Sequence, residues 1–285
     1  MLGALLCLYT CLLTPTLGAV IGFSLDIEPS VGAQSVAFVN TLAAWRTALQ
    51  PTGLLLSVDA GTAWSSSPDW VTTVNGTSKL LSEWLVDLSD EAILMDYDRN
   101  ASKLLARALP YLSYADRRGK AVTVGLALAP PGAASTWWQC ADLVELEALV
   151  ASVHPALAQH ASFTQRYALF HAGTLWNSST ANVTLVNEEK TLWYLVDDWI
   201  YNASARQDFL ALAARQRIVQ VYDAPHAGSR PHIGASASDE ALYRSFVQIT
   251  HAQGIDIQFM SGLANLPQDL AFIKSTGLGQ RPSRH

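Results

Sequence analysis

Acidic side chains stand at the ends of several short apolar runs in this chain. The first pair, Asp26 and Glu28, closes the run Val20–Glu28; two residues apart on an extended strand, they point to the same side. Repulsion between neighbouring carboxylates raises the pKa of one of them. A protonated acid beside a charged partner is what glycosidic bond cleavage needs. We therefore expect Glu28 to be a general acid and Asp26 its partner.

Other polar and aromatic residues follow later apolar runs, and they could complete such a site. We expect Tyr97 to assist catalysis, since it ends the third run, and exposed aromatic rings can stack on sugars. The residues expected to bind substrate are Asp59, Trp64, Asp98, His171 and Trp176. Two alternatives stay open: Asp26 and Glu28 could form structural hydrogen bonds or ion pairs, and His171 could be a hydrogen-bonded structural residue.

Eight apolar runs that alternate with helical patterns would position these residues. Near-continuous apolar runs are typical of parallel strands covered on both faces. The expected strands are Val20–Glu28, Leu54–Asp59, Ala92–Tyr97, Ala121–Leu128, Tyr167–Ala172, Leu192–Val196, Ile218–Tyr222 and Asp256–Met260. This α/β pattern predicts a (β/α)8 TIM-type barrel, whose chemistry lies at the carboxyl ends of the strands. An open doubly wound sheet is the alternative, but no glycine-rich turn follows the first run.

The pattern predicts one barrel domain over residues 20–285, after a separate segment at 1–19. The Asn-rich stretch Thr174–Lys190 is expected to be a polar surface loop. It divides the expected strand units into five before it and three after it.

Composition excludes several classes of function. The net charge is −6 and no basic run occurs, so a nucleic-acid partner is not expected. The three cysteines, Cys7, Cys11 and Cys140, form no CxxC pair and no zinc-like cluster with histidine. We expect neither a metal nor another cofactor.

Five Asn-x-Ser/Thr sequons predict a glycoprotein of the secretory pathway; they begin at Asn75, Asn100, Asn177, Asn182 and Asn202. The apolar segment Met1–Leu17, with the small residues Gly18 and Ala19 after it, resembles a signal peptide. It could alternatively be a membrane anchor, the one case in which a membrane would be a partner, or a helix of the fold. We expect a secreted, extracellular protein.

Two segments resemble motifs of the chitinase-type glycoside hydrolases. Residues 22–28, GFSLDIE, resemble the fourth-strand motif DGxDxDxE, and Met95-Asp96-Tyr97-Asp98 resembles the sixth-strand motif Met-x-Tyr-Asp. Asp26–Pro29 is also similar to the Asp-Ile-Glu-Pro of uncharacterised barrel proteins related to glycosidases. The sequence departs from the first motif at Ile21 and Ser24, where the family has aspartates.

The resemblance implies that Glu28 is the acid, that Asp26 is its partner, that Tyr97 donates a hydrogen bond near the sugar and that Asp98 orients substrate. It also implies that Val20–Glu28 is the family's fourth strand. The chain would then be a circularly permuted barrel or a fragment spanning two tandem barrels.

Together these features predict a secreted hydrolase that cleaves glycosidic bonds of a poly- or oligosaccharide by carboxylate acid catalysis. Its partner would be a carbohydrate substrate. The alternative is a non-catalytic glycan-binding barrel or an inactive fragment.

Overall fold

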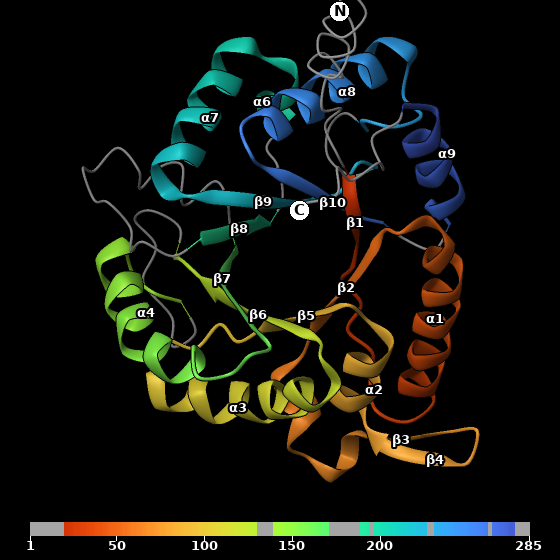
Figure 1. Ribbon diagram of the computed structural model, residues 1–285, viewed down its shortest axis with the longest axis vertical. Helices are drawn as coiled ribbons and strands as arrows, with labels where there is room; N and C mark the ends of the chain where they lie inside the picture. Colours follow the sequence, from red (N-terminus) through yellow and green to blue (C-terminus); the bar gives the residue numbers. More distant parts are fainter. Residues whose placement is uncertain are drawn as a thin grey trace, which may run out of the picture.

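A computed structural model describes residues 20–129, 139–170, 189–193, 197–226, 231–261 and 264–276. Within these ranges, eight parallel strands form a closed barrel with helices around it (Figure 1). The barrel strands are β1 (Val20–Leu25), β2 (Leu55–Ala60), β5 (Glu91–Met95), β6 (Ala121–Ala127), β7 (Phe163–Phe170), β8 (Glu189–Trp193), β9 (Ile218–Asp223) and β10 (Asp256–Met260).

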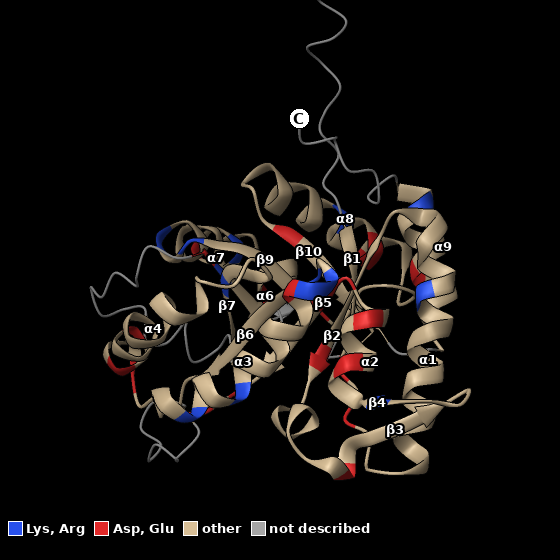
Figure 2. Ribbon diagram, turned by 60° about the horizontal axis from the view of Figure 1, so that its bottom comes forward, with Lys and Arg blue, Asp and Glu red and all other residues tan. Residues whose placement is uncertain are grey.

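The helices lie on the outside of the barrel, between the strands that they connect. They are α1 (Ala33–Leu49), α2 (Leu81–Leu88), α3 (Ala101–Arg118), α4 (Leu143–Leu157), α6 (Asp197–Tyr201), α7 (Ala203–Gln216), α8 (Ala237–Ala252) and α9 (Leu266–Thr276), with short 3-10 turns at Gln50–Thr52, Thr62–Ser65 and Pro68–Trp70. Figure 2 shows basic residues on these outer helices, for example on α3 and α9.

A β-hairpin of β3 (Val71–Val74) and β4 (Thr77–Leu80) is inserted between β2 and α2. Its turn contains Asn75 and Gly76, both with positive φ (50° and 78°). Two-residue hairpin loops of this kind favour Asn-Gly because these residues tolerate positive φ. Strand β4 runs to Leu80, and α2 begins at the next residue, Leu81.

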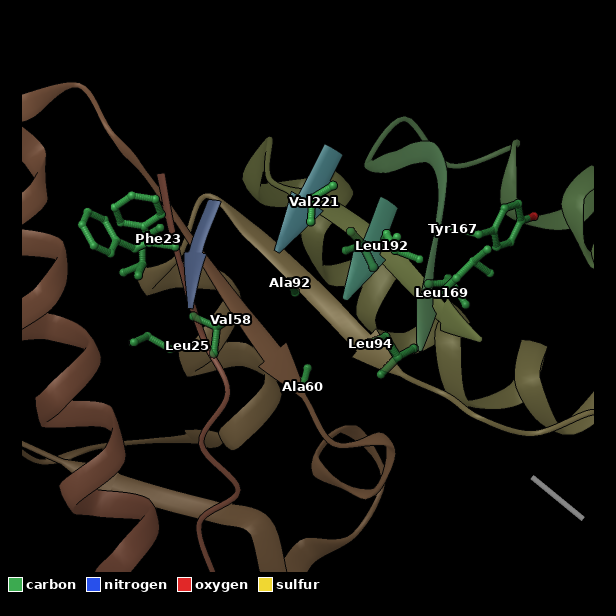
Figure 3. Packing of buried hydrophobic residues seen from close by; sticks show 14 of the residues in the cluster. Phe23, Leu25, Val58, Ala60, Ala92, Leu94, Tyr167, Leu169, Leu192 and Val221 are labelled. Atoms are coloured by element: carbon green, nitrogen blue, oxygen red, sulfur yellow. The ribbon is translucent and has the colours of Figure 1, made fainter. Parts of the chain in front are cut away.

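Alternation along the strands builds two buried layers. One set of side chains points outward and packs under the helices, including Phe23, Leu25, Val58, Leu94 and Val221 (Figure 3). The residues of opposite parity point into the barrel. Ile93, Ala168 and Tyr222 form a small separate cluster there, and Met95, Tyr97, Phe170 and Met260 pack against it. The barrel interior is therefore filled by side chains.

The predicted (β/α)8 barrel is confirmed, including its closure. Strand β10 pairs with β1, and β8 pairs with β7 across the polar stretch of the sequence. Two of the boundaries that differ from expectation bear on residues discussed above. Strand β1 ends at Leu25, so Asp26 and Glu28 lie in the loop that follows, and β8 already begins at Glu189, inside the stretch expected to be a loop.

Two segments singled out in the sequence lie wholly or mostly outside the described residues. The segment 1–19 and most of the predicted loop 174–190 lie outside the described residues. Among the helices that are described, none has the length and apolarity needed to cross a membrane.

Phe23 provides a test of barrel closure. Its ring is fully buried, with the Trp45 and Phe259 ring centroids at 5.6 and 5.9 Å, so it joins α1, β1 and β10. We predict that Phe23→Ala lowers the free energy of unfolding by about 3–5 kcal/mol because it leaves a cavity in this contact. Urea denaturation would measure the loss. Val71→Ala, at an exposed position, is the control; equal effects of both changes would contradict this packing.

Candidate active site

The register between β1 and β2 brings acidic residues from both strands together. Ser24 lies beside Ser57 and Leu25 beside Val58. Asp59 is the residue after Val58 on β2, and Asp26 follows Leu25 directly as the first residue of the loop after β1. Asp59 has inward parity, because Val58 points outward into the core under the helices. Carboxyl groups therefore lie at the carboxyl ends of two neighbouring strands.

Asp59 is the buried member of this group. Its side chain is 1% exposed, and its Oδ1 atom is buried without a hydrogen-bond partner among the described residues. Burial, followed by the negative charges of Asp26, Glu91 and Glu28, raises the pKa of Asp59 well above its ordinary value. An aspartate in such surroundings holds its proton because ionisation would place an unpaired charge in the interior.

Asp26 and Glu28 lie nearer the solvent. Both are exposed residues of the loop after β1. Loss of hydration at the mouth, and then the charge of Glu28, raises the pKa of Asp26. The sequence led us to expect the raised pKa at Glu28, the assigned acid, whereas the carboxyl group whose pKa this repulsion raises here is that of Asp26. The negative charges of Asp26 and Glu28 both act on Asp59, so the three acidic groups lie near one another at the carboxyl end of the barrel.

A polar network lies deeper in the barrel than these three acidic residues. Glu91, the first residue of β5, is buried and accepts hydrogen bonds from the hydroxyl groups of Ser57 and Thr123. Arg166 on β7 lies 3.9 Å from Glu91, measured from Nη2 to Oε1, and donates a 2.8 Å hydrogen bond to Gln220. Sequence analysis missed Glu91 because it placed the start of this strand at Ala92; its inward parity with Ile93 could have identified it.

Tyr97 enters the mouth from β5 because the residues on either side of it point outward. Asp96 and Asp98 each contact Arg107 on α3, at 3.1 and 3.0 Å. Asp98 also accepts the backbone N–H of Asn100 at 2.9 Å. Asp98 is 3% exposed, so the structure places it against α3, not in the cleft where a substrate contact was expected. Asp96 and Asp98 instead hold Tyr97 in its inward position.

The mouth has an aromatic side as well as an acidic one. The rings of Tyr97 and Phe170 stack, with centroids 5.2 Å apart and planes inclined by 22°. Both are partly buried and pack, with Met95 and Met260, on the interior cluster. The sequence did not identify Phe170 as a site residue, because strand β7 was expected to end at Ala172 and His171 was therefore assigned to the mouth.

One further expected substrate contact, Trp64, is not available to a ligand at the barrel mouth. Trp64 was expected at its rim but is 4% exposed, because its ring folds back over Gly61 and packs against Phe38 and Trp70. A buried ring cannot stack on a sugar, so that expectation was wrong. His171 and Trp176 lie outside the described residues.

A cavity of about 340 Å³ lies at the opposite, amino end of the barrel. Its lining includes Asp116, Lys120 and Ser162. Asp116 accepts the Ser162 N–H and lies 2.7 Å from His160 Nδ1, and these contacts tie α3 to the start of β7. In barrels of this type the amino end serves stability and the carboxyl end carries chemistry. The carboxyl end of the barrel, with its acidic residues, is therefore the better candidate for an active site.

Metal binding has no support within the described ranges. They contain no group of three or more His, Cys, Asp or Glu side chains with the geometry to hold an ion.

Compared with models of known protein families and with curated proteins, the chain shows no significant match.

The surroundings of Asp96 generate a prediction about pH. Burial raises the pKa of Asp96 to about 7, although Arg107 opposes the shift. Between pH 4 and pH 7 the folded protein therefore keeps a proton that the unfolded chain releases, and stability from this group is lost as the pH rises. Asp96→Asn removes this titration. The free energy of unfolding of Asp96→Asn minus that of the parent should therefore increase by about 4 kcal/mol between pH 4 and pH 8, at about 1.4 kcal/mol per pKa unit.

Urea denaturation of both proteins across this range would measure the difference. Asp69→Asn, at an exposed carboxyl group, is the control and should run parallel to the parent. Parallel curves for Asp96→Asn as well would show that Asp96 titrates normally.

Proposed function

We propose that the protein is a glycoside hydrolase that cleaves a poly- or oligosaccharide by carboxylate acid catalysis at the barrel mouth. The observation that supports this most strongly is the position of Asp26, Glu28 and Asp59 at the carboxyl ends of β1 and β2, two strands that pair in parallel. Active sites of (β/α)8 enzymes lie at this end of the barrel.

In this proposal Glu28 gives its proton to the glycosidic oxygen as the bond to the sugar breaks, and water then adds to the anomeric carbon and returns a proton to Glu28. Asp26 supplies the negative charge that stabilises the oxocarbenium-like transition state. Tyr97 donates a hydrogen bond to the sugar, and the partly buried rings of Tyr97 and Phe170 offer an apolar face for it. The substrate would thus lie between an acidic side and an aromatic side of one cleft.

Glu28→Gln tests this chemistry because glutamine keeps the shape of the side chain but cannot donate the proton. We predict a loss of about 10²–10⁴-fold in the rate of hydrolysis. The parent and the variant would be assayed on a panel of polysaccharides and aryl glycosides. The matched control is Glu189→Gln, an exposed position at the start of β8, where no loss is expected.

Equal rates for the parent and Glu28→Gln on a cleaved substrate would show that Glu28 is not the acid. A parent that binds a glycan but cleaves nothing in the panel would instead indicate the non-catalytic glycan-binding barrel.

We also propose that the protein is secreted and N-glycosylated. The sequon residues Asn75, Asn100 and Asn202 are all exposed. Asn100 and Asn202 cap α3 and α7 by accepting backbone N–H groups with Oδ1. A glycan attaches to the other side-chain atom, Nδ2, so these caps are compatible with glycosylation.

Each described sequon can be removed without changing its asparagine, through Thr77→Ala, Ser102→Ala or Ser204→Ala. In protein secreted from eukaryotic cells, we predict that each substitution lowers the apparent mass by one glycan, because the hydroxyl residue is required for transfer. Enzymatic removal of N-glycans should abolish the differences between variants. An unchanged mass in all three, or a product retained in the cytosol, would contradict the proposal.

A further inference from the structure

A buried aspartate and a histidine meet at the carboxyl ends of β9 and β10. His226 lies three residues after β9, Ser261 directly follows β10, and Asp269 lies in the first turn of α9. Strand β10 pairs in parallel with β1, so these residues lie at the same end of the barrel as Asp26 and Glu28. The proposed hydrolysis uses none of the three.

Asp269 fixes the orientation of the His226 ring. The Asp269 side chain is fully buried; its Oδ2 atom accepts the hydroxyl of Ser261, and its Oδ1 atom lies 2.5 Å from Nε2 of His226. Burial raises the pKa of Asp269, and the hydrogen bonds from Ser261 and His226 oppose this rise because they favour the charged form. A carboxylate can only accept, so the neutral His226 ring carries its proton on Nε2.

The other ring nitrogen, Nδ1, is then an acceptor. The His226 side chain is 17% exposed, and Nδ1 has no hydrogen-bond partner among the described residues. In a nucleophilic triad the histidine lies between the serine and the acid. Here Asp269 lies between Ser261 and His226, so His226 is not placed to take the proton of Ser261. Its Nδ1 atom is available to a ligand instead.

We propose that His226 binds a hydroxyl group of a sugar through Nδ1, with Asp269 as the residue that positions the ring. A neutral imidazole that donates from Nε2 accepts a hydrogen bond at Nδ1, and hydroxyl groups are the donors that every poly- or oligosaccharide offers. The class of ligand rests on the proposed function, whereas the position of the ring proton does not. His226 acts in binding, since Glu28 supplies the proton for cleavage.

The position of the ring proton can be measured on the whole protein by ¹⁵N NMR of the histidine rings at pH 8. We expect Nδ1 of His226 to be the nitrogen without a proton. In Asp269→Asn the amide oxygen can still accept from Ser261, so the amide nitrogen faces Nε2 and donates to it. The ring proton should then move to Nδ1.

The matched control is Asp116→Asn, which makes the same change beside another histidine. Nδ1 of His160 lies 2.7 Å from Asp116, so His160 should carry its proton on Nδ1, and this substitution should leave His226 unchanged. A proton on Nδ1 of His226 in the parent would overturn the inference whether or not the Asp269 variant folds. The absence of a reversal in a folded Asp269→Asn would overturn the positioning role.

Binding is tested with His226→Ala and His226→Asn on the polysaccharides and aryl glycosides that the parent cleaves. Loss of one hydrogen bond should raise KM about 10-fold in His226→Ala and leave kcat within about 2-fold. His226→Asn keeps an acceptor one bond from Cγ, as Nδ1 is, and should raise KM less. An unchanged KM in His226→Ala, or a loss confined to kcat, would overturn the binding role.

The outcomes separate this inference from the hydrolase proposal. If the parent binds a glycan of the panel without cleaving it, and His226→Ala weakens that binding about 10-fold, the inference stands and the hydrolase proposal fails. If Glu28→Gln abolishes cleavage while His226→Ala keeps the KM of the parent, the reverse holds. A parent that neither cleaves nor binds any member of the panel overturns both.

Discussion

The alignment of β1 with β2 is the constraint on which the candidate site depends. Strand β1 closes the barrel between β2 and β10, and its register with β2 is fixed by backbone hydrogen bonds and by outward side chains such as Phe23, Leu25 and Val58. A slip of one residue would turn all of these side chains to the wrong face. The packing under the helices therefore also determines which carboxyl groups meet at the mouth.

That meeting has an electrostatic consequence. Asp59 is removed from water and surrounded by negative neighbours, so the proton is held where the charge would be least well solvated. Asp26 and Glu28 lie nearer the solvent, as exposed residues of the loop after β1. On the opposite side, Arg107 pairs with both Asp96 and Asp98, which keeps Tyr97 directed inward. Structural ion pairs outside the barrel thus support the arrangement inside it.

Much of the fold could be predicted from the sequence because each barrel strand is a compact apolar run followed by a helical pattern. The burial of Asp59 could not, since it depends on how the strands pair and close into the barrel. Asp98 was misplaced although alternation alone, with Tyr97 pointing inward, sends it outward. The burial of Trp64 depends on a turn that folds back over Gly61, which no local pattern in the sequence indicates.

The most direct test of this account is a double-mutant cycle at pH 8 with Asp26→Asn, Asp59→Asn and the combined variant, each followed by urea denaturation. If the charge of Asp26 raises the pKa of Asp59, the effect of Asp59→Asn depends on whether Asp26 is present, and the double variant should differ from the sum of the single effects by more than about 0.5 kcal/mol. Additive effects would show that the two side chains do not interact, which would contradict the arrangement of the site.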